Sequence, residues 1–447
     1  MKNPLDKDYN IFSLFRYTIP SILSILFMSL YMMVDSIFVA NFVSENALAA
    51  INITYPVISV IIAITLMFSS GGSAIVARKL GERKDRAAKE DFTVLILATV
   101  LTSAVISVLS LLFLSPLLDF LGATPALWQD CEDYLKILLP AFPIATLQPS
   151  LCTFLVTAGK PHYSFILTLL SGITNIVLDY ILIVVYPMGI SGAAIGTTVG
   201  YLVAVFPAAL YFCLQRKGTI YFVRPFLRIR MLGFACYNGS SEMITNLAVS
   251  VTTLLFNKLT LFYMGEGGVA AITIILYAQF LLTAVFMGFI GGAAPIFSFN
   301  FGSHNMKRIA SLFRSSLSMV LGLTVLMMIV AYAWAKPIIG VYIRPESELF
   351  PLALHGFLIF SVSYLFTGFN IYTSGLFTAL QNGKISAIVS GLRTFVFLII
   401  CLLLLPLLIG PDGIWLAVPV AEGLSFLFAV GFMIRYRHEY HFYLFRD

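Results

Sequence analysis

The sequence GGSAIVARKLGERKDR, residues 71–86, joins the end of a long apolar segment to a cluster of basic residues. A similar succession, GGAAPIFSFNFGSHNMKR, occupies residues 291–308 in the second half of the chain. Two other glycine signals recur at nearly the same separation: Gly159-Lys160 recurs as Gly383-Lys384, and the pair Gly189 and Gly192 recurs as Gly410 and Gly413. The nearly constant offset between the members of each pair indicates that the chain consists of two sequence-related halves.

The composition is that of a membrane protein. Of 447 residues, 60% are hydrophobic and only 11% are charged, whereas a soluble domain carries about 25% charged residues. The polar start MKNPLDKDYN precedes an apolar run long enough to span a bilayer, so we expect no signal peptide. The five cysteines have no metal-ligand spacing and are expected to pack between helices.

Twelve stretches are apolar over about the 20 residues that a membrane-spanning helix requires. They are residues 13–40, 51–77, 92–116, 129–157, 164–187, 191–214, 235–261, 269–296, 314–335, 350–380, 385–409 and 414–434. We predict an all-α integral membrane protein of two six-helix bundles, related by a parallel repeat because six spans preserve the orientation. The expected parts are an N-terminal bundle at 1–218, a cytoplasmic linker at 219–234, a C-terminal bundle at 235–434 and a cytoplasmic tail at 435–447.

Charge distribution orients these spans. Of the 27 lysine and arginine residues, 22 fall in the N-terminal arm, in the tail or in every second loop. Because cytoplasmic loops carry the excess of positive charge, both termini are predicted to be cytoplasmic.

Four acidic residues lie inside the predicted spans, Asp35, Asp179, Glu242 and Glu422. A charged carboxylate at the bilayer centre costs about 2.5–3.5 kcal/mol on insertion scales. We therefore treat all four as candidates for a functional role.

The first-half acids are predicted to share one pocket in the outer half of the membrane. Spans one and five run outward, which places Asp35 and Asp179 at similar depth, and Asn175 precedes Asp179 by one helical turn. Spans four and six start outside and add Tyr134 and Thr197. Such oxygen donors suit Na⁺, and two neighbouring carboxyls suit H⁺ because like charges repel. The alternative is that both aspartates are structural and cap backbone groups at helix breaks.

The second-half polar residues are more dispersed. Glu242 lies in the inner half of the second bundle, either as the partner of a basic residue or as part of a cavity. Glu422 is expected to pair with Arg393 of the preceding span, which would be a structural role. Three amides are expected to form helix–helix contacts: Gln279, Asn370 and Gln381.

Pro20 shares the first span with Asp35. Proline breaks the helical hydrogen-bond ladder, so Pro20 produces either a fixed kink or a hinge. We predict a hinge for alternating access, because protonation of Asp35 would change its partners along the same helix.

Several catalytic motifs do not occur in the sequence. We find no GxxxxGK[ST], HExxH, GxSxG or GxGxxG pattern, and we expect neither an ATP-driven pump nor an enzyme. No cofactor is expected besides H⁺ or Na⁺ as coupling ion.

Taken in order, several segments resemble the multidrug and toxic compound extrusion (MATE) family. They are Pro20 with VDSIFVANFVSENALAA, then GGSAIVARKLGERKDRAA, NIVLDYILIVVYPMGISGAAIGT, APIFSFNFG, ALQNGK and GIWLAVPVAEG. The resemblance implies a V-shaped pair of bundles around a central cavity. It also implies export of organic, often cationic, amphipathic compounds in exchange for H⁺ or Na⁺.

The family's first-half cation site maps onto Asp35, Asn175, Asp179 and Thr197, with Tyr134 lining the same cavity. The pattern is closer to the branch named after DNA-damage-inducible protein F (DinF) than to the NorM-like branch, because residues 350–380 contain no Asp or Glu. The resemblance further implies a multi-pass monomer in a prokaryotic plasma (inner) membrane, with small molecules and lipids, but no nucleic acid, as partners.

Two rival functions remain open at this point. A flippase of lipid-linked oligosaccharides or cell-wall precursors shares the broader fold but would need a basic cavity for phosphates, whereas these spans hold mostly acids. A passive channel would not transport against a gradient. We favour a cation-coupled antiporter whose ion coupling lies in the first half alone.

Overall fold

The structure is a computed structural model that describes residues 4–443, and these residues form helices joined by turns and, between the two halves, by a longer irregular linker at 215–228. The first half contains α1 (Ile11–Phe42), α2 (Glu45–Gly81), α3 (Asp85–Leu112), α4 (Leu114–Leu121), α5 (Trp128–Ala145), α6 (Leu147–Thr157), α7 (Pro161–Asp179), the π-helix η1 (Tyr180–Val185) and α8 (Gly189–Leu214). The second half contains α9 (Ile229–Gly302), α10 (Met306–Ala333), α11 (Ala335–Gly340), α12 (Leu349–Ser361), α13 (Tyr364–Ala379), α14 (Gly383–Gly391), the π-helix η2 (Leu392–Val396), α15 (Phe397–Ile409) and α16 (Asp412–Arg435).

These helices account for the twelve predicted spans. Ten continuous helical stretches of the described chain are long and apolar enough to cross a membrane, and α12 with α13 forms an eleventh span bent by 50°. Helix α9 has 74 residues, or about 110 Å at 1.5 Å per residue, far more than the roughly 30 Å of a bilayer core. It is two spans, because the backbone leaves the helical conformation at Gly265, where φ is 68°.

Three differences between the helix bounds and the predicted spans bear on the architecture. The first span of α9 begins at Ile229, before the predicted start at 235 and inside the predicted linker. The predicted spans 129–157 and 350–380 are both broken, the first between α5 and α6 and the second between α12 and α13. Hydropathy does not detect such breaks, because the apolar composition continues across them.

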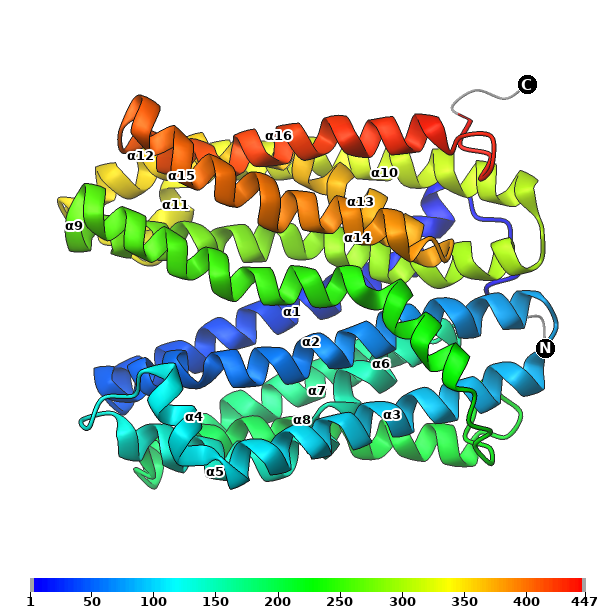
Figure 1. Ribbon diagram of the computed structural model, residues 1–447, viewed down its shortest axis with the longest axis horizontal. Helices are drawn as coiled ribbons and strands as arrows, with labels where there is room; N and C mark the ends of the chain where they lie inside the picture. The colour runs from blue at the N-terminus through cyan, green and yellow to red at the C-terminus, as the bar shows by residue number, and fades with distance from the viewer. Residues whose placement is uncertain (1–3, 444–447) are drawn as a thin grey trace.

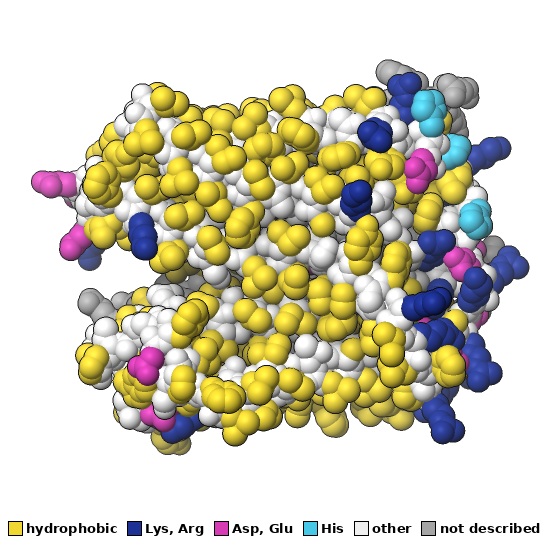
Figure 2. All heavy atoms as spheres, viewed as in Figure 1, with side chains coloured by type: hydrophobic (Ala, Val, Ile, Leu, Met, Phe, Trp, Pro, Cys, Tyr) yellow, Lys and Arg dark blue, Asp and Glu magenta, His cyan; other side chains and the backbone are white. Residues whose placement is uncertain are grey.

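The helices form two bundles that lie side by side (Figure 1). Helices α1 to α8 form the first bundle and α9 to α16 the second, with α1 and α2 packed against α9 between them. Lysine and arginine side chains gather at the end formed by the α2–α3 turn, the linker 215–228, the α9–α10 turn and residues 436–443 (Figure 2). We call this the basic end. At the opposite end, the open end, Figure 2 shows a cleft between the bundles.

The repeat is visible in the backbone. Residues with positive φ occur in equivalent turns of the two halves: Arg83 and His304, Gly159 and Gln381, and Gly189 and Gly410, with almost the same separation along the chain in each pair. The pairing of Gly159 with Gly383, expected from the sequence, is therefore wrong, because Gln381 holds the equivalent position. Gly383 begins α14 instead and lies where a Cβ atom would come within 2.6 Å of the Tyr237 carbonyl oxygen.

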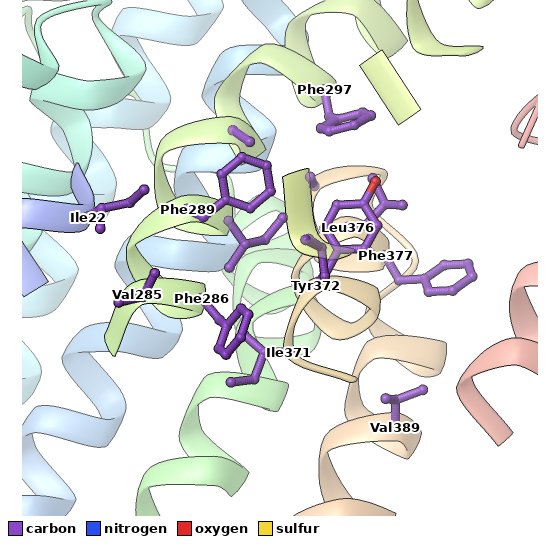
Figure 3. Close-up of a cluster of buried hydrophobic side chains, with 14 of the residues drawn as sticks. Ile22, Val285, Phe286, Phe289, Phe297, Ile371, Tyr372, Leu376, Phe377 and Val389 are labelled. Carbon is purple, nitrogen blue, oxygen red and sulfur yellow. The ribbon is translucent and has the colours of Figure 1, made fainter. Parts of the chain in front are cut away.

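The core of the second bundle is aromatic (Figure 3). Phe286 and Phe289 of α9 face Ile371 and Tyr372 of α13, and the Phe289 and Tyr372 rings stack with centroids 6.5 Å apart. Gly368 leaves room for this contact, since a Cβ atom there would lie 2.4 Å from the Phe286 ring. In a membrane such close packing, rather than exclusion of water, holds helices together.

Glycine contacts close the two bundles together at the basic end. A Cβ atom on Gly71 of α2 would lie 2.1 Å from the Ala235 carbonyl oxygen of α9, and one on Gly239 would lie 2.0 Å from the Met67 oxygen. The α2 and α9 termini repeat the arrangement, with Gly81 against Phe299 and Gly302 against Arg78. No side chain fits at these positions, so the backbones of the two bundles touch directly.

The N-terminal segment, residues 4–10, crosses the basic end between the bundles. Pro4 packs on Gly159 of the first bundle. On the second bundle, Asn300 Nδ2 of α9 donates to the Leu5 carbonyl oxygen at 3.5 Å, and Arg308 of α10 forms ion pairs with Asp6 and Asp8 at 2.5 and 2.6 Å. The segment therefore ties the two bundles together where the glycine contacts close them.

Candidate functional site

The two first-half aspartates meet in the open-end half of the first bundle. Asp35 lies about two turns before the end of α1, and Asp179 is the last residue of α7. Gly172 of α7 allows this approach, because a Cβ atom there would lie 2.5 Å from the rings of Phe27 and Tyr31 on α1. Both carboxyl groups thus lie close together at a similar depth, as the sequence predicts.

The two carboxyl groups lie within hydrogen-bonding range of each other. Asp179 is fully buried, and its Oδ1 accepts a 3.4 Å hydrogen bond from Asn175 Nδ2. Asp35 Oδ1 and Asp179 Oδ2 are buried and have no N–H or O–H donor among the described residues. Ionised carboxylates only accept hydrogen bonds, so a bond between the two groups requires one proton, which would also satisfy an otherwise unpaired oxygen.

A cluster of tyrosines surrounds the carboxyl pair. Tyr134 of α5, predicted from the sequence, is buried close to both aspartates. Tyr31 and Tyr201 lie beside each other and near Asp35. Neither tyrosine was predicted from the sequence, although Tyr31 precedes Asp35 by one helical turn and therefore shares its helix face.

Helix α8 approaches the carboxyl pair through glycines. A Cβ atom on Gly196 would lie 2.4 Å from Asp179 Oδ1, and one on Gly200 would lie 3.0 Å from the Ser171 carbonyl oxygen of α7. Thr197 is half-buried one turn before Tyr201, on the same side of α8, but its hydroxyl forms no hydrogen bond with a described residue. The expected Thr197 ligand is thus near the site without contacting either carboxyl.

The structure contradicts the reading of the aspartates as capping residues. Asp35 lies within the continuous helix α1, away from any break. Asp179 does precede the π-helix η1, but its side chain forms no capping hydrogen bond there. A π-helical turn widens the backbone and is frequently found at functional sites, and neither hydropathy nor charge in the sequence indicated it.

The second-half polar residues form a separate cluster. Arg393, within η2, lies 3.6 Å (Nε to Oε1) from Glu422 of α16, as the sequence predicts. Asn370 of α13 donates to Glu422 Oε2 at 2.6 Å, and Glu242 of α9 is within electrostatic range of Arg393. Arg393 therefore has one ion-pair partner, Glu422, and a second carboxyl group farther away.

The remaining candidates are placed as follows. Gln381 Nε2 donates to the Ala74 carbonyl oxygen of the other bundle at 3.3 Å, so it is a helix–helix contact. The Gln279 side chain forms no hydrogen bond with a described residue, so the same expectation for it finds no support. Pro20 is buried in α1, where Gly288 and Gly292 of α9 pack on the adjacent turn. The helix is continuous through Pro20, and the hinge stays a prediction.

Chemically, the first-bundle site can hold and release a small cation. Within residues 4–443, no group of three or more His, Cys, Asp or Glu side chains is placed to bind a metal ion. The site consists instead of two carboxyls, one amide and tyrosine hydroxyls, which offer oxygen ligands inside the first bundle. Parallel internal repeats of membrane-spanning helices are characteristic of transporter folds.

The chain belongs to the MatE family, whose sequence profile matches residues 20–181 and 242–403. The profile thus matches the chain twice, once in each half, as the internal repeat requires. Members of this family are transporters and not enzymes.

Individual relatives cover nearly the whole chain. Multidrug export protein MepA of Staphylococcus saprophyticus is 23% identical over 422 residues, which are 93% of this chain and 91% of that protein. An outward-facing structure of a multidrug resistance MATE family transporter of the MOP superfamily is 19% identical, with a TM-score of 0.90 over 98% of this chain and 99% of that chain. A MOP superfamily transporter from Pyrococcus furiosus, described as having a binding pocket of reverse polarity, is 20% identical, with a TM-score of 0.88 over 97% and 98% of the two chains. These structures establish the fold.

Proposed function

We propose that the protein is a secondary active multidrug antiporter that exports organic, often cationic, amphipathic compounds in exchange for H⁺. One observation carries the proposal: the half-buried Asp35 and the fully buried Asp179 are in contact with each other, and each keeps a buried oxygen without an N–H or O–H donor among the described residues. Such a pair holds one proton in place of a cation and accepts a cation when the proton leaves. The export activity in the name of the related MepA protein agrees with this direction of transport.

Proton coupling is favoured over Na⁺ coupling by the arrangement of the donors. Na⁺ requires several oxygen ligands around one point, but the Asn175 amide nitrogen, not its oxygen, faces Asp179, and the Thr197 hydroxyl forms no hydrogen bond with either carboxyl. A proton needs only the two carboxyl oxygens. We infer that the first bundle, residues 1–218, is the coupling half and that no other cofactor takes part.

The distribution of charge supports an orientation with the basic end in the cytoplasm. Both ends of the described chain lie at this end (Figure 1), where lysine and arginine side chains gather (Figure 2). The cleft at the open end then faces outward.

In this state protonation of the Asp35–Asp179 pair displaces a bound organic cation into the cleft. After the bundles rearrange, the pair loses its proton to the cytoplasm and the site is reset. We expect a monomer in a prokaryotic plasma membrane.

A phosphate-binding flippase is disfavoured by the second-half cluster. Arg393 is the main basic residue inside the spans, and the carboxyls of Glu422 and Glu242 engage its charge. No strong anion site is left for a lipid-linked phosphate in this region. Because the span 349–379 contains no acid, we also infer a place in the DinF-like rather than the NorM-like branch.

The test is transport in proteoliposomes with independently imposed proton and sodium gradients. We expect a proton gradient to drive uptake of a fluorescent organic cation, and both D35N and D179N to abolish it. The matched control is Asp119→Asn, which changes an exposed aspartate of α4 at the same end. Transport driven by Na⁺ alone would refute proton coupling, and full activity of both variants would refute the site.

A further inference from the structure

A pocket at the basic end lies outside the transport site. It is formed by the α2–α3 turn, the first turns of α3 and the end of the linker before α9, and has a volume of about 510 Å³. Its lining includes Arg83, Lys84, Arg86, Glu90, Phe226 and Arg228. The volume falls within the range of small-molecule sites, so a phosphate with its glycerol would fit.

The pocket has an excess of positive charge. Four basic and two acidic residues line it. Glu90 in the lining and Asp91 behind it are already engaged, because Arg228 contacts them at 2.7 Å and 3.3 Å. The other lining acid, Asp85, forms no ion pair with a described residue, so it offsets one of the four positive charges. Lys79 also pairs with Asp91.

Two arginines at the mouth of the pocket are available to a ligand. Arg83 forms no ion pair with a described residue, and it occupies the tip of the turn with a φ of 59°. The Arg86 side chain contacts Glu90 at 3.1 Å but is 94% exposed, so this pair contributes little stability in water. An anion at the mouth would therefore gain two charge-assisted contacts without breaking a buried ion pair.

The neighbouring linker is suited to the membrane interface. Phe226, Leu227 and Ile229 expose 58%, 65% and 77% of their surface, and the Arg228 guanidinium lies 5.0 Å from the centre of the Phe226 ring. Apolar side chains exposed beside basic ones are typical of segments that lie at the boundary of headgroups and acyl chains. The mouth of the pocket thus lies at headgroup depth.

We propose that this pocket binds the headgroup of an anionic glycerophospholipid from the leaflet at the basic end. The phosphate lies between Arg83 and Arg86, and the acyl chains follow Phe226 and Leu227. Arg228 immediately precedes α9, whose first span closes against α2 through Gly239 and Gly71. A lipid in the pocket therefore links the α2–α3 turn to the start of α9 and stabilises the closed basic end.

The test measures lipid binding to the full-length purified protein through its thermal unfolding midpoint in detergent. We expect phosphatidylglycerol to raise the midpoint and phosphatidylcholine not to do so. The double variant Arg83→Gln/Arg86→Gln should bind phosphatidylglycerol about 25-fold more weakly, from about fivefold per basic side chain. Glutamine is compatible with the turn, because Gln381 adopts a φ of 62° in another turn of the same chain.

Lys307→Gln is the matched control. Lys307 is exposed in the first turn of α10, which is the equivalent in the second half of the first turn of α3 that carries Arg86. Its loss should leave phosphatidylglycerol binding unchanged. Equal weakening by Lys307→Gln would show general charge attraction and overturn the proposal. Stabilisation by inorganic phosphate alone to the same extent would assign the pocket to a soluble anion, and an unchanged affinity of the double variant would exclude the pocket.

Discussion

The closed basic end depends on the absence of a side chain at Gly239. Replacing Gly239 with alanine would place its Cβ atom 2.0 Å from the Met67 carbonyl oxygen and near the backbone of Gly71. Ordinary van der Waals contact begins at 3.4 Å, so α2 and α9 must move apart by the difference between these two distances. Neither neighbour can rotate away, because both are backbone.

Moving α2 and α9 apart costs free energy that can be estimated. Adding a methyl group to a packed contact costs about 1–3 kcal/mol, which corresponds to roughly a 5- to 150-fold change in an equilibrium between two conformations. Only the conformation with a closed basic end contains the contact. We therefore expect Gly239→Ala to increase the ratio of inward-open to outward-open protein by this factor.

Spin labels can report the ratio directly. Arg86 and Lys307 are exposed and lie at equivalent positions of the two bundles at the basic end. With the exposed Cys213 replaced by serine, labels at these two sites should show a larger population of long distances in Gly239→Ala. The control is Gly233→Ala on the same helix, where a Cβ atom meets no atom within 4 Å. A distance distribution identical to that of the parent, in a folded Gly239→Ala protein, would refute the reasoning.

Three further predictions concern single contacts. Gly196→Ala would place a Cβ atom 2.4 Å from Asp179 Oδ1. We therefore expect gradient-driven transport to fall at least tenfold while the protein is still expressed in the membrane. Normal transport would mean that the position of the Asp179 carboxyl is not critical. Glu422→Gln leaves the partly buried charge of Arg393 without its closest carboxylate. Since breaking a buried pair costs about 3–5 kcal/mol, the midpoint of thermal unfolding should drop clearly. A midpoint equal to that of the parent protein within error would show that water solvates the arginine. Arg308→Gln removes two exposed ion pairs of the N-terminal segment, each worth at most about 1 kcal/mol. Overall stability should therefore change little, but proteolysis of residues 4–10 should become faster. An unchanged cleavage rate would show that the contacts of Asn300 and Pro4 suffice to hold the segment in place.

The membrane topology was largely predictable because its signals are local. Hydropathy placed one span at 191–214, and the structure has α8 at Gly189–Leu214. The depth of Asp35 and Asp179 followed from counting along helices of known direction, and the structure brings these carboxyls together. Each inference needed only the residues of one helix and the orientation of the chain.

What the sequence did not indicate are contacts between helices. Tyr201 joins the site because α8 packs on α7 through Gly196 and Gly200, and residue type alone does not distinguish these glycines from others. The equivalence of Gly159 with Gln381 was missed because the shared property is a left-handed backbone, which one half forms without glycine.

The sequence by itself determined a twelve-span membrane protein in two related halves, together with the helices that carry its acids. These properties follow from how each segment partitions between water and lipid, which depends on composition along the chain. Only the tertiary structure decided that the Asp35 and Asp179 carboxyls come into direct contact, that glycine backbones close the basic end, and that Gln381 contacts the backbone of the other bundle. Those contacts depend on how closely two helices approach, which is set by packing across the bundles and cannot be found from one segment alone.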